Sequence, residues 1–212
     1  MKIAFQGPTG TLEGYLHLPK ETWPCPGVVV CHPHPLMGGD MSNSVVMGIC
    51  HALAQVGIAS LRFNFRGVGT SQGTHNEGIG EIDDAMEALR FLASHEEIQH
   101  GNVGLAGYSF GAGVAMKTAL RDAVPKALSV VARARVGSED DLALRQSLPM
   151  QFVTGDQDRL MPLDQVNELT TKLTVPPEMH VIPEAGHFFH GREREVGELV
   201  AGFFQRYLKA SV

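Results

Sequence analysis

Short apolar segments alternate along the chain with longer segments in which apolar residues recur every three or four positions. The short segments, rich in Val, Ile and Phe, predict six strands, at residues 28–31, 59–65, 103–108, 127–131, 151–154 and 180–182. The longer segments predict five helices, at residues 43–55, 82–94, 110–121, 163–173 and 193–209. Residues 7–10, Gly-Pro-Thr-Gly, predict the turn of an antiparallel hairpin at the edge of the sheet. The pattern therefore predicts an α/β fold, a mostly parallel sheet of about eight strands with helices on both faces.

The last predicted helix carries its large apolar residues on one face. We expect this face to pack in the core rather than against a second copy of the chain. Its members are Val196, Leu199, Val200, Phe203, Phe204 and Tyr207.

Length and charge narrow the class of protein. The 212 residues, with a formal net charge of −6, contain no basic run of five or more and no stretch of 18 apolar residues. We expect one domain over residues 1–212, a cytoplasmic monomer or homodimer that binds neither nucleic acid nor membrane. Cys25, Cys31 and Cys50 form no C-x-x-C pair, which predicts buried thiols rather than disulfides or a structural zinc site.

Glycine, at 24 residues, is more frequent than average, and it gathers in loops that follow predicted strands, where parallel sheets bind ligands. Two of these loops, residues 69–73 and 107–111, contain the pattern Gly-x-Ser-x-Gly, which places a serine on a sharp turn with its hydroxyl exposed. The second runs from a strand directly into a helix, whereas residues 74–78 separate the first from any helix. Context therefore predicts Ser109 as a nucleophile and Ser71 as a loop or capping residue.

A nicotinamide-binding loop is a competing interpretation of the same glycines. Gly107, Gly111 and Gly113 have the spacing that resembles the cofactor loop of short-chain dehydrogenases. In that family the loop follows the first strand and a Tyr-x-x-x-Lys pair performs the catalysis. Here the loop is in mid-chain, and none of the three tyrosines has a lysine four residues later. Residues 67–73 also miss the dinucleotide fingerprint by one position, so we expect no cofactor.

A nucleophilic serine needs a histidine to take its proton and a carboxylate to orient that histidine. The last two predicted strands are followed by candidates: Asp156 and Asp158 after one, His187 and His190 after the other. The order Ser, Asp, His is the chain order of α/β-hydrolases. Over roughly residues 27–208 the chain resembles that superfamily, in particular its small lidless serine esterases of the dienelactone-hydrolase-like subgroup. That resemblance includes a His-Pro-His-Pro segment and an Arg-Gly-x-Gly-x-Ser-x-Gly loop, here HPHPLMGG and RGVGTSQG.

The resemblance implies a role for each candidate. The superfamily's Gly-x-x-Asp with a proline four residues on matches Asp158, which leaves Asp156 as a turn residue. His187, at the strand end and directly after a glycine, is the expected base, and His190 an expected surface or capping residue. One backbone N–H of the oxyanion hole should come from Phe110, directly after the nucleophile.

The second oxyanion donor should come from the loop after the first central strand. Pro33 and Pro35 have no N–H, which leaves His34 and Leu36, and the match of His32 to the superfamily's His-Gly favours His34. We expect the imidazoles of His32 and His34 to bond nearby backbone. No carboxylate or cysteine is arranged to complete a metal site with them, so we expect no metal.

Superfamily members often insert a lid where this chain has residues 132–149, which are too few for a lid domain. This favours an open pocket and small or short-chain acyl groups. Arg133 and Arg135 are candidates to bind an anionic substrate group, although pairing with the carboxylates at 139–141 is the simpler expectation. Candidates to line the pocket are Leu36, Met37, Phe110, Met161, Phe188 and Phe189.

These expectations predict a carboxylesterase that acts through Ser109, His187 and Asp158. A thioesterase or amide hydrolase would use the same residues, and only the leaving group separates them. A non-catalytic binding protein of the same fold would usually show a broken triad. A dienelactone hydrolase proper would be expected to have cysteine at position 109, where this chain has serine.

Overall fold

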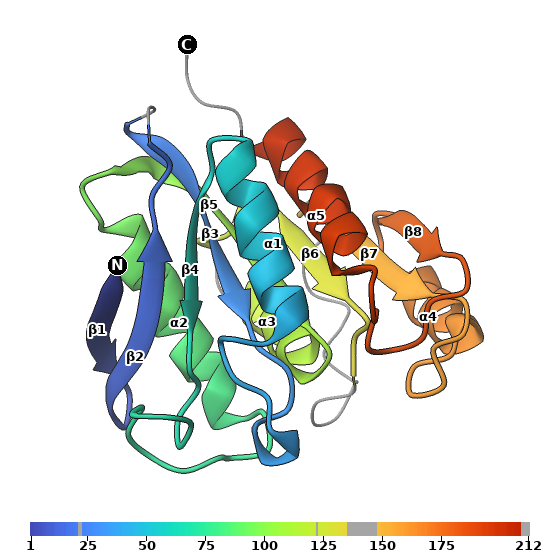
Figure 1. The fold of residues 1–212 in the computed structure, drawn as a ribbon, viewed down its shortest axis with the longest axis horizontal. Helices are drawn as coiled ribbons and strands as arrows, with labels where there is room; N and C mark the ends of the chain where they lie inside the picture. Colours follow the sequence, from blue (N-terminus) through green and yellow to red (C-terminus); the bar gives the residue numbers. More distant parts are fainter. Residues whose placement is uncertain (21–22, 122, 135–147, 209–212) are drawn as a thin grey trace.

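The computed structural model describes residues 1–20, 23–121, 123–134 and 148–208. Its strands are β1 (Lys2–Gly7), β2 (Gly10–His17), β3 (Cys25–Cys31), β4 (Ala59–Phe63), β5 (Ile98–Tyr108), β6 (Leu128–Val131), β7 (Met150–Gly155) and β8 (Glu178–Ile182). They form one sheet in the order β1-β2-β4-β3-β5-β6-β7-β8 (Figure 1). β1 and β2 form the predicted hairpin, β2 is antiparallel to β4, and the remaining pairs are parallel. The predicted α/β sheet is confirmed.

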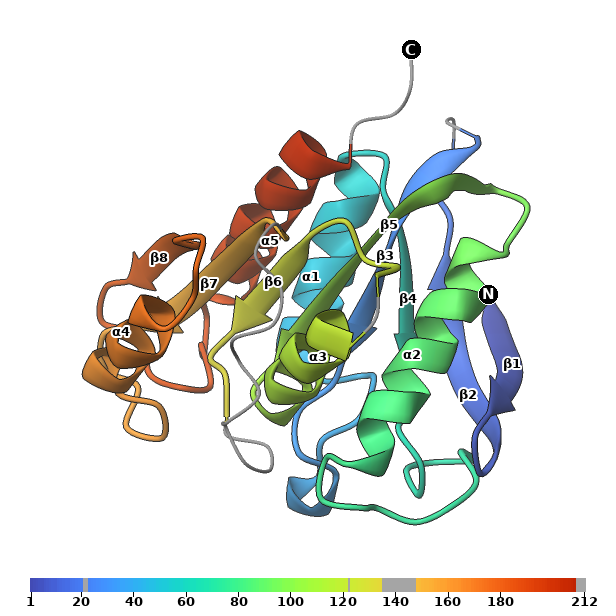
Figure 2. The same ribbon diagram turned by 180° about the vertical axis from the view of Figure 1, so that it is seen from behind.

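Five helices cover this sheet: α1 (Ser44–Gln55), α2 (Gly80–Ala93), α3 (Phe110–Arg121), α4 (Leu163–Thr171) and α5 (Glu193–Tyr207). Helices α1 and α5 pack on one face (Figure 1), and α2, α3 and α4 on the other (Figure 2). Each layer buries its own apolar cluster against the strands. Because the central strands are covered on both sides, they read as continuous apolar runs rather than as alternating ones. The described residues contain no separate lid domain.

The carboxyl ends of the central strands lie side by side. Cys31, at the end of β3, is in register with Gly107 of β5, and Tyr108, at the end of β5, with Val131 of β6. The loops that follow these strands therefore emerge at the same edge of the sheet, where ligands bind in folds of this kind. Helix α3 begins two residues after β5 ends, so Ser109 alone separates strand from helix.

Strand β4 is shorter than predicted, ending at Phe63 rather than at residue 65. The next two backbone N–H groups have acceptors outside the parallel ladder. Asn64 donates to the carbonyl of Glu13 (3.0 Å), and Phe65 donates to Nε2 of His32 (3.1 Å). The first bond continues the pairing with β2, and the second docks the chain against the loop that follows β3.

The apolar face of α5 is buried as predicted, except at its last turn. Val196, Val200, Phe203 and Phe204 are fully buried and Leu199 is half-buried. Tyr207, expected in the core, is 41% exposed instead. Its hydroxyl donates to Oε1 of Glu178 (3.0 Å) on the edge strand β8, so a polar partner holds the ring at the surface.

The three cysteines are buried free thiols, as predicted. Burial raises the pKa of Cys50 to about 11, so this thiol stays protonated and unreactive at neutral pH. Within the described ranges, no helix is long and apolar enough to cross a membrane.

Candidate active site

Ser109 occupies a strained turn between β5 and α3. Its φ is 55°, a left-handed conformation that is uncommon for residues other than glycine. A Cβ on Gly107 would overlap the carbonyl of Gly111, and a Cβ on Gly111 would overlap the carbonyl of Cys31, so both positions need glycine for close backbone approach. The Ser109 N–H donates to the carbonyl of Val131 (2.9 Å), which holds the turn in place. The surrounding packing thus maintains a strain of the kind that clusters at active sites.

The structure brings the three predicted side chains of a triad together. Oγ of Ser109 lies 2.9 Å from Nε2 of His187, and Nδ1 of His187 lies 2.8 Å from Oδ2 of Asp158. All three residues are buried. An ionised carboxylate can only accept, so Nδ1 carries the ring proton and Nε2 is left to accept from the serine hydroxyl. This arrangement makes a serine nucleophilic at neutral pH.

The Asp158 carboxylate is held in its ionised form. Burial raises the pKa of this carboxyl, but hydrogen bonds from His187 and from the backbone lower it by more. The pKa therefore lies below its ordinary value. The backbone donors are the N–H groups of Leu160 and Met161, each 2.9 Å from Oδ1. These bonds also fix the carboxylate's orientation toward the imidazole.

The competing candidates lie elsewhere. Asp156 and His190 are exposed, and the His190 ring stacks on Phe188 with 5.7 Å between ring centroids. The hydroxyl of Ser71 donates to the carbonyl of Asn64 (2.7 Å) and accepts from the N–H of Glu13, so backbone groups are its partners. Of each pair of alternatives, one member therefore belongs to the hydrogen-bonded group of Ser109, His187 and Asp158, and the other does not.

A hydroxyl that sequence reasoning missed supports the base. Tyr108 donates from its phenol to the backbone carbonyl of His187 (3.1 Å), and burial raises the pKa of that phenol, which keeps it a donor. In the sequence this tyrosine is only the variable residue before the serine, so the pattern contains no signal for its role.

Two backbone N–H groups are the oxyanion candidates, one directly after Ser109 and one in the loop after β3 that lines the cleft. Phe110 is the first residue of α3, and N–H groups in a first turn lack an acceptor within the helix. His34 precedes the short 3-10 helix η1 (Pro35–Met37), and its Nδ1 accepts from the N–H of Leu36 (3.2 Å). That bond engages the Leu36 N–H inside the loop, so His34 is the better placed of the two candidates. The ring centroids of His34 and Phe110 are 4.8 Å apart.

His32 has the structural role expected of it. Its Nδ1 lies 2.6 Å from the carbonyl of Pro33, and its Nε2 accepts from Phe65. Burial lowers the pKa of His32 to about 4, so the ring is neutral at physiological pH. Within the described part of the chain, no group of three or more His, Cys, Asp or Glu residues is placed to hold a metal ion.

A cleft of about 240 Å³ opens onto this site, lined among others by Ser109, His187, His34, Tyr108, Met37, Leu160 and Phe188. Met37 and Phe188 are therefore where the pocket prediction put them. The predictions for Leu36 and Met161 are wrong. Leu36 is 75% exposed and outside the lining, and Met161 is buried in the apolar cluster beneath α4 because its backbone turns toward Asp158.

Two further pocket candidates, Phe110 and Phe189, are core residues. Leu160, which no sequence signal singled out, takes a lining position beside Met161. Arg133 is buried just after β6. Arg135 and the carboxylates at 139–141 lie outside the described residues, so the pairing expected for them stays a prediction.

Known proteins resemble this chain along almost its whole length. The model of the dienelactone hydrolase family matches residues 12–210. An uncharacterized protein of Rickettsia prowazekii is 33% identical over 208 residues, covering 94% of this chain and 86% of that protein.

Two solved structures share the fold at appreciable identity. An α/β serine hydrolase homologue from Coxiella burnetii is 37% identical, with a TM-score of 0.85 over 95% of this chain and 96% of that one. A lidless α/β serine hydrolase from Xanthomonas campestris is 30% identical, with a TM-score of 0.89 over 100% of this chain and 96% of that one. With the family model, these matches confirm the resemblance inferred from the motifs: the chain belongs to the dienelactone hydrolase family of α/β-hydrolases.

Proposed function

We propose that the protein hydrolyses small carboxylic esters through an acyl-enzyme intermediate on Ser109. The observation that carries this proposal is the continuous chain of hydrogen bonds from Ser109 through His187 to Asp158 at the floor of the cleft. Family membership supports a hydrolase. Serine at position 109, in place of the cysteine expected of a dienelactone hydrolase proper, supports a serine-esterase reaction.

In the first half of the reaction, Oγ of Ser109 bonds to the ester carbonyl carbon while its proton passes to Nε2 of His187. The N–H groups of Phe110 and His34 stabilise the negative oxygen of the tetrahedral intermediate, each such donor contributing about 10²–10³ in rate. The intermediate collapses as the carbon–oxygen bond to the alcohol breaks, and His187 returns the proton to the leaving oxygen. Asp158 keeps the imidazolium oriented and stabilised throughout.

In the second half, water takes the place of the alcohol. His187 removes a proton from water as the water oxygen bonds to the acyl carbon. Collapse of this second intermediate breaks the bond to Ser109 and returns the proton to Oγ, which releases the carboxylic acid. Each turnover consumes one ester and one water, and Ser109 and His187 return to their starting protonation states.

Cleft size and the apolar rim favour small acyl groups. About 240 Å³ lies below the 300–1,000 Å³ of typical ligand pockets. The side chains of Met37, Leu160 and Phe188 line the cleft yet are largely exposed to solvent, so they form an open apolar rim. A short acyl chain fits within such a cleft, whereas a long chain would have to lie over the rim in contact with water.

A panel of p-nitrophenyl esters tests the proposal: acetyl, butyryl, octanoyl and lauroyl, with wild type and Ser109→Ala. We expect the specificity constant to be highest for acetyl or butyryl and Ser109→Ala to lose at least about 10³-fold in kcat. Acyl thioesters of the same chains separate an esterase from a thioesterase. Near wild-type turnover by Ser109→Ala, or a maximum at lauroyl, would overturn the corresponding part of the proposal.

A further inference from the structure

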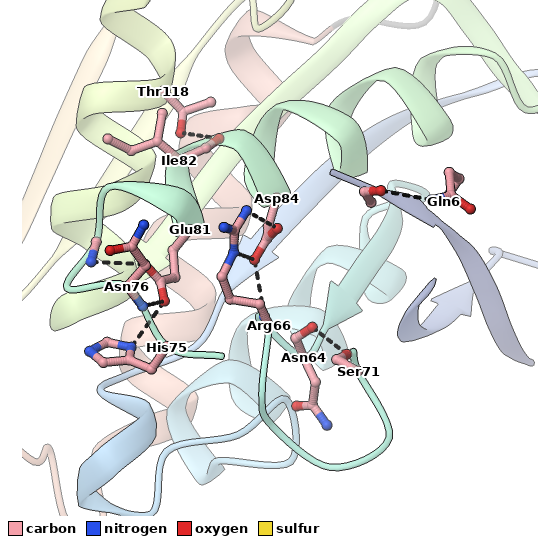
Figure 3. A network of polar contacts seen from close by, with 12 residues as sticks. Gln6, Asn64, Arg66, Ser71, His75, Asn76, Glu81, Ile82, Asp84 and Thr118 are labelled. Atoms are coloured by element: carbon pink, nitrogen blue, oxygen red, sulfur yellow. Dashed lines mark hydrogen bonds and ion pairs between the residues drawn. The ribbon is translucent and has the colours of Figure 1, made fainter. Parts of the chain in front are cut away.

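A buried carboxylate lies close to the oxyanion loop but outside the triad. Glu81, in the first turn of α2, is fully buried. It accepts from the N–H of Asn76 at Oε1 and from the N–H of Gly78 at Oε2, both at 2.8 Å, and Nδ1 of His75 lies 3.0 Å from Oε1 (Figure 3). A buried carboxylate is costly unless it is hydrogen-bonded, and the two N–H groups that donate to Glu81 among the described residues both belong to residues 75–78. Glu81 therefore determines the path of that segment and the orientation of the His75 ring.

The His75 ring packs on both residues assigned to the oxyanion hole. Its centroid is 5.1 Å from that of His34 and 5.5 Å from that of Phe110, and those two rings are 4.8 Å from each other. The three rings thus form one cluster, here called the oxyanion ring cluster. The side chain of His75 is only 12% exposed, and His75 is not among the residues that line the cleft. It contacts the groups that hold the donors, not the place where substrate would bind.

The His34 loop needs support of this kind. The N–H groups of Met37 and Gly39 both donate to the His34 carbonyl, which folds the loop onto itself without fixing it against α3. The contacts of the His34 ring with the rings of Phe110 and His75 hold the loop against α3. A misplacement of about 1 Å in a catalytic constellation can cost 10²-fold in rate, so a support that fixes both donors has a measurable effect.

We propose that His75, oriented by Glu81, is a positioning residue. Its ring holds the backbone amides of His34 and Phe110 in the positions from which they donate to the oxyanion. The proposal rests on the ester-hydrolase function proposed above, since it assigns no chemistry of its own to His75. It gives a buried His–Glu pair outside the triad a role in the rate of the chemical step.

The test compares His75→Ala, which removes the ring, with His75→Gln, which keeps a hydrogen-bond donor for Glu81 but also removes the ring. The matched control is His95→Ala. His95 also pairs with a glutamate, its Nδ1 lying 2.6 Å from Oε2 of Glu97, but it follows α2 at the far end from the cleft. Each variant is assayed for kcat and KM with p-nitrophenyl acetate, for thermal unfolding, and for its affinity for a trifluoromethyl ketone, whose adduct with a serine has a negatively charged oxygen.

We expect both His75 variants to lose about 10- to 10²-fold in kcat, with KM changed by much less, and to bind the trifluoromethyl ketone more weakly by a similar factor. His95→Ala should keep the wild-type values. His75→Gln keeps a polar N–H group beside Glu81, so it decides the question if His75→Ala does not fold. Wild-type kcat and inhibitor affinity in His75→Gln, or a loss confined to KM or to thermal stability, would overturn the positioning role alone. A wild-type protein that forms no adduct with the ketone and cleaves no ester would overturn the proposed function and the positioning role with it.

Discussion

Two loops share the pattern Gly-x-Ser-x-Gly, but the left-handed backbone conformation falls on different residues of the pattern in each loop. At residues 107–111 the serine takes the left-handed conformation, and the glycines are needed because neighbouring carbonyls approach them closely. At residues 69–73 the left-handed conformations fall on the glycines, with φ of 58° at Gly69 and 91° at Gly73. Glycine therefore allows close backbone approach in one loop and a left-handed conformation in the other.

The two hydroxyls differ accordingly. Ser71 donates to the carbonyl of Asn64 (2.7 Å) and accepts from the N–H of Glu13 (3.1 Å), so backbone groups use its hydrogen bonds. The hydroxyl of Ser109 faces His187 at the cleft. A glycine-flanked serine thus gains the geometry of a nucleophile from the strand before it and the helix after it, and without them it secures a loop.

Replacement of the carboxylate that contacts His187 should change activity the most. Asp158→Asn should lower kcat by about 10⁴-fold, because an amide at this position can favour the wrong imidazole tautomer. Asp156→Asn, at an exposed position two residues earlier, should keep wild-type activity. Steady-state kinetics with p-nitrophenyl acetate measure both. Equal losses in the two variants, or the larger loss in Asp156→Asn, would remove Asp158 from the triad.

The loop that contains Ser71 should also respond to pH through its anchor. His32 accepts from Phe65 at the start of that loop, and burial lowers the pKa of His32 to about 4, below an ordinary value of about 6.5. Between these values the unfolded chain binds a proton that the folded chain does not, so stability falls as pH drops from about 6.5 to 4, by about 3 kcal/mol.

The measurement is the free energy of unfolding against pH for wild type and His32→Gln. We expect part of the slope in that window to disappear in the variant. Replacement of the exposed His190 by glutamine should leave the slope as in wild type. An unchanged slope in His32→Gln would show that His32 titrates normally.

The smallest effect concerns Ser71 itself. Ser71→Ala should lower the free energy of unfolding by about 1–3 kcal/mol, because the Asn64 carbonyl and the Glu13 N–H lose their shared partner. Its activity should stay within a few-fold of wild type. Denaturant unfolding and ester hydrolysis on the same preparation measure both quantities. A variant as stable as wild type but with low activity would reverse the roles assigned to the two loops.

Local pattern was sufficient for the sheet, because central strands buried on both faces must be apolar along their length. It also placed Ser109, His187 and both candidate aspartates at strand ends, but the choice of Asp158 over Asp156 came from the resemblance to α/β-hydrolases. The end of β4 was not predictable, because the acceptors of Asn64 and Phe65 lie 51 and 33 residues away in sequence. Long-range bonds of this kind leave no local signal.

The direction of side chains in loops could not be predicted either, because it also depends on contacts between residues that are distant in sequence. Met161 and Leu160 are adjacent and both apolar, and both N–H groups bond to Asp158, yet Met161 is buried and Leu160 lines the cleft. The contact between His75 and Glu81 joins a loop to a helix, and no periodicity or spacing in the sequence marks it.

The most direct test of the central claim is to label the wild-type protein with a fluorophosphonate and to map the adduct by mass spectrometry. We expect one adduct per chain, on Ser109, absent from Ser109→Ala and fully formed in Ser71→Ala. An adduct on Ser71, or an unmodified Ser109 in correctly folded protein, would contradict it.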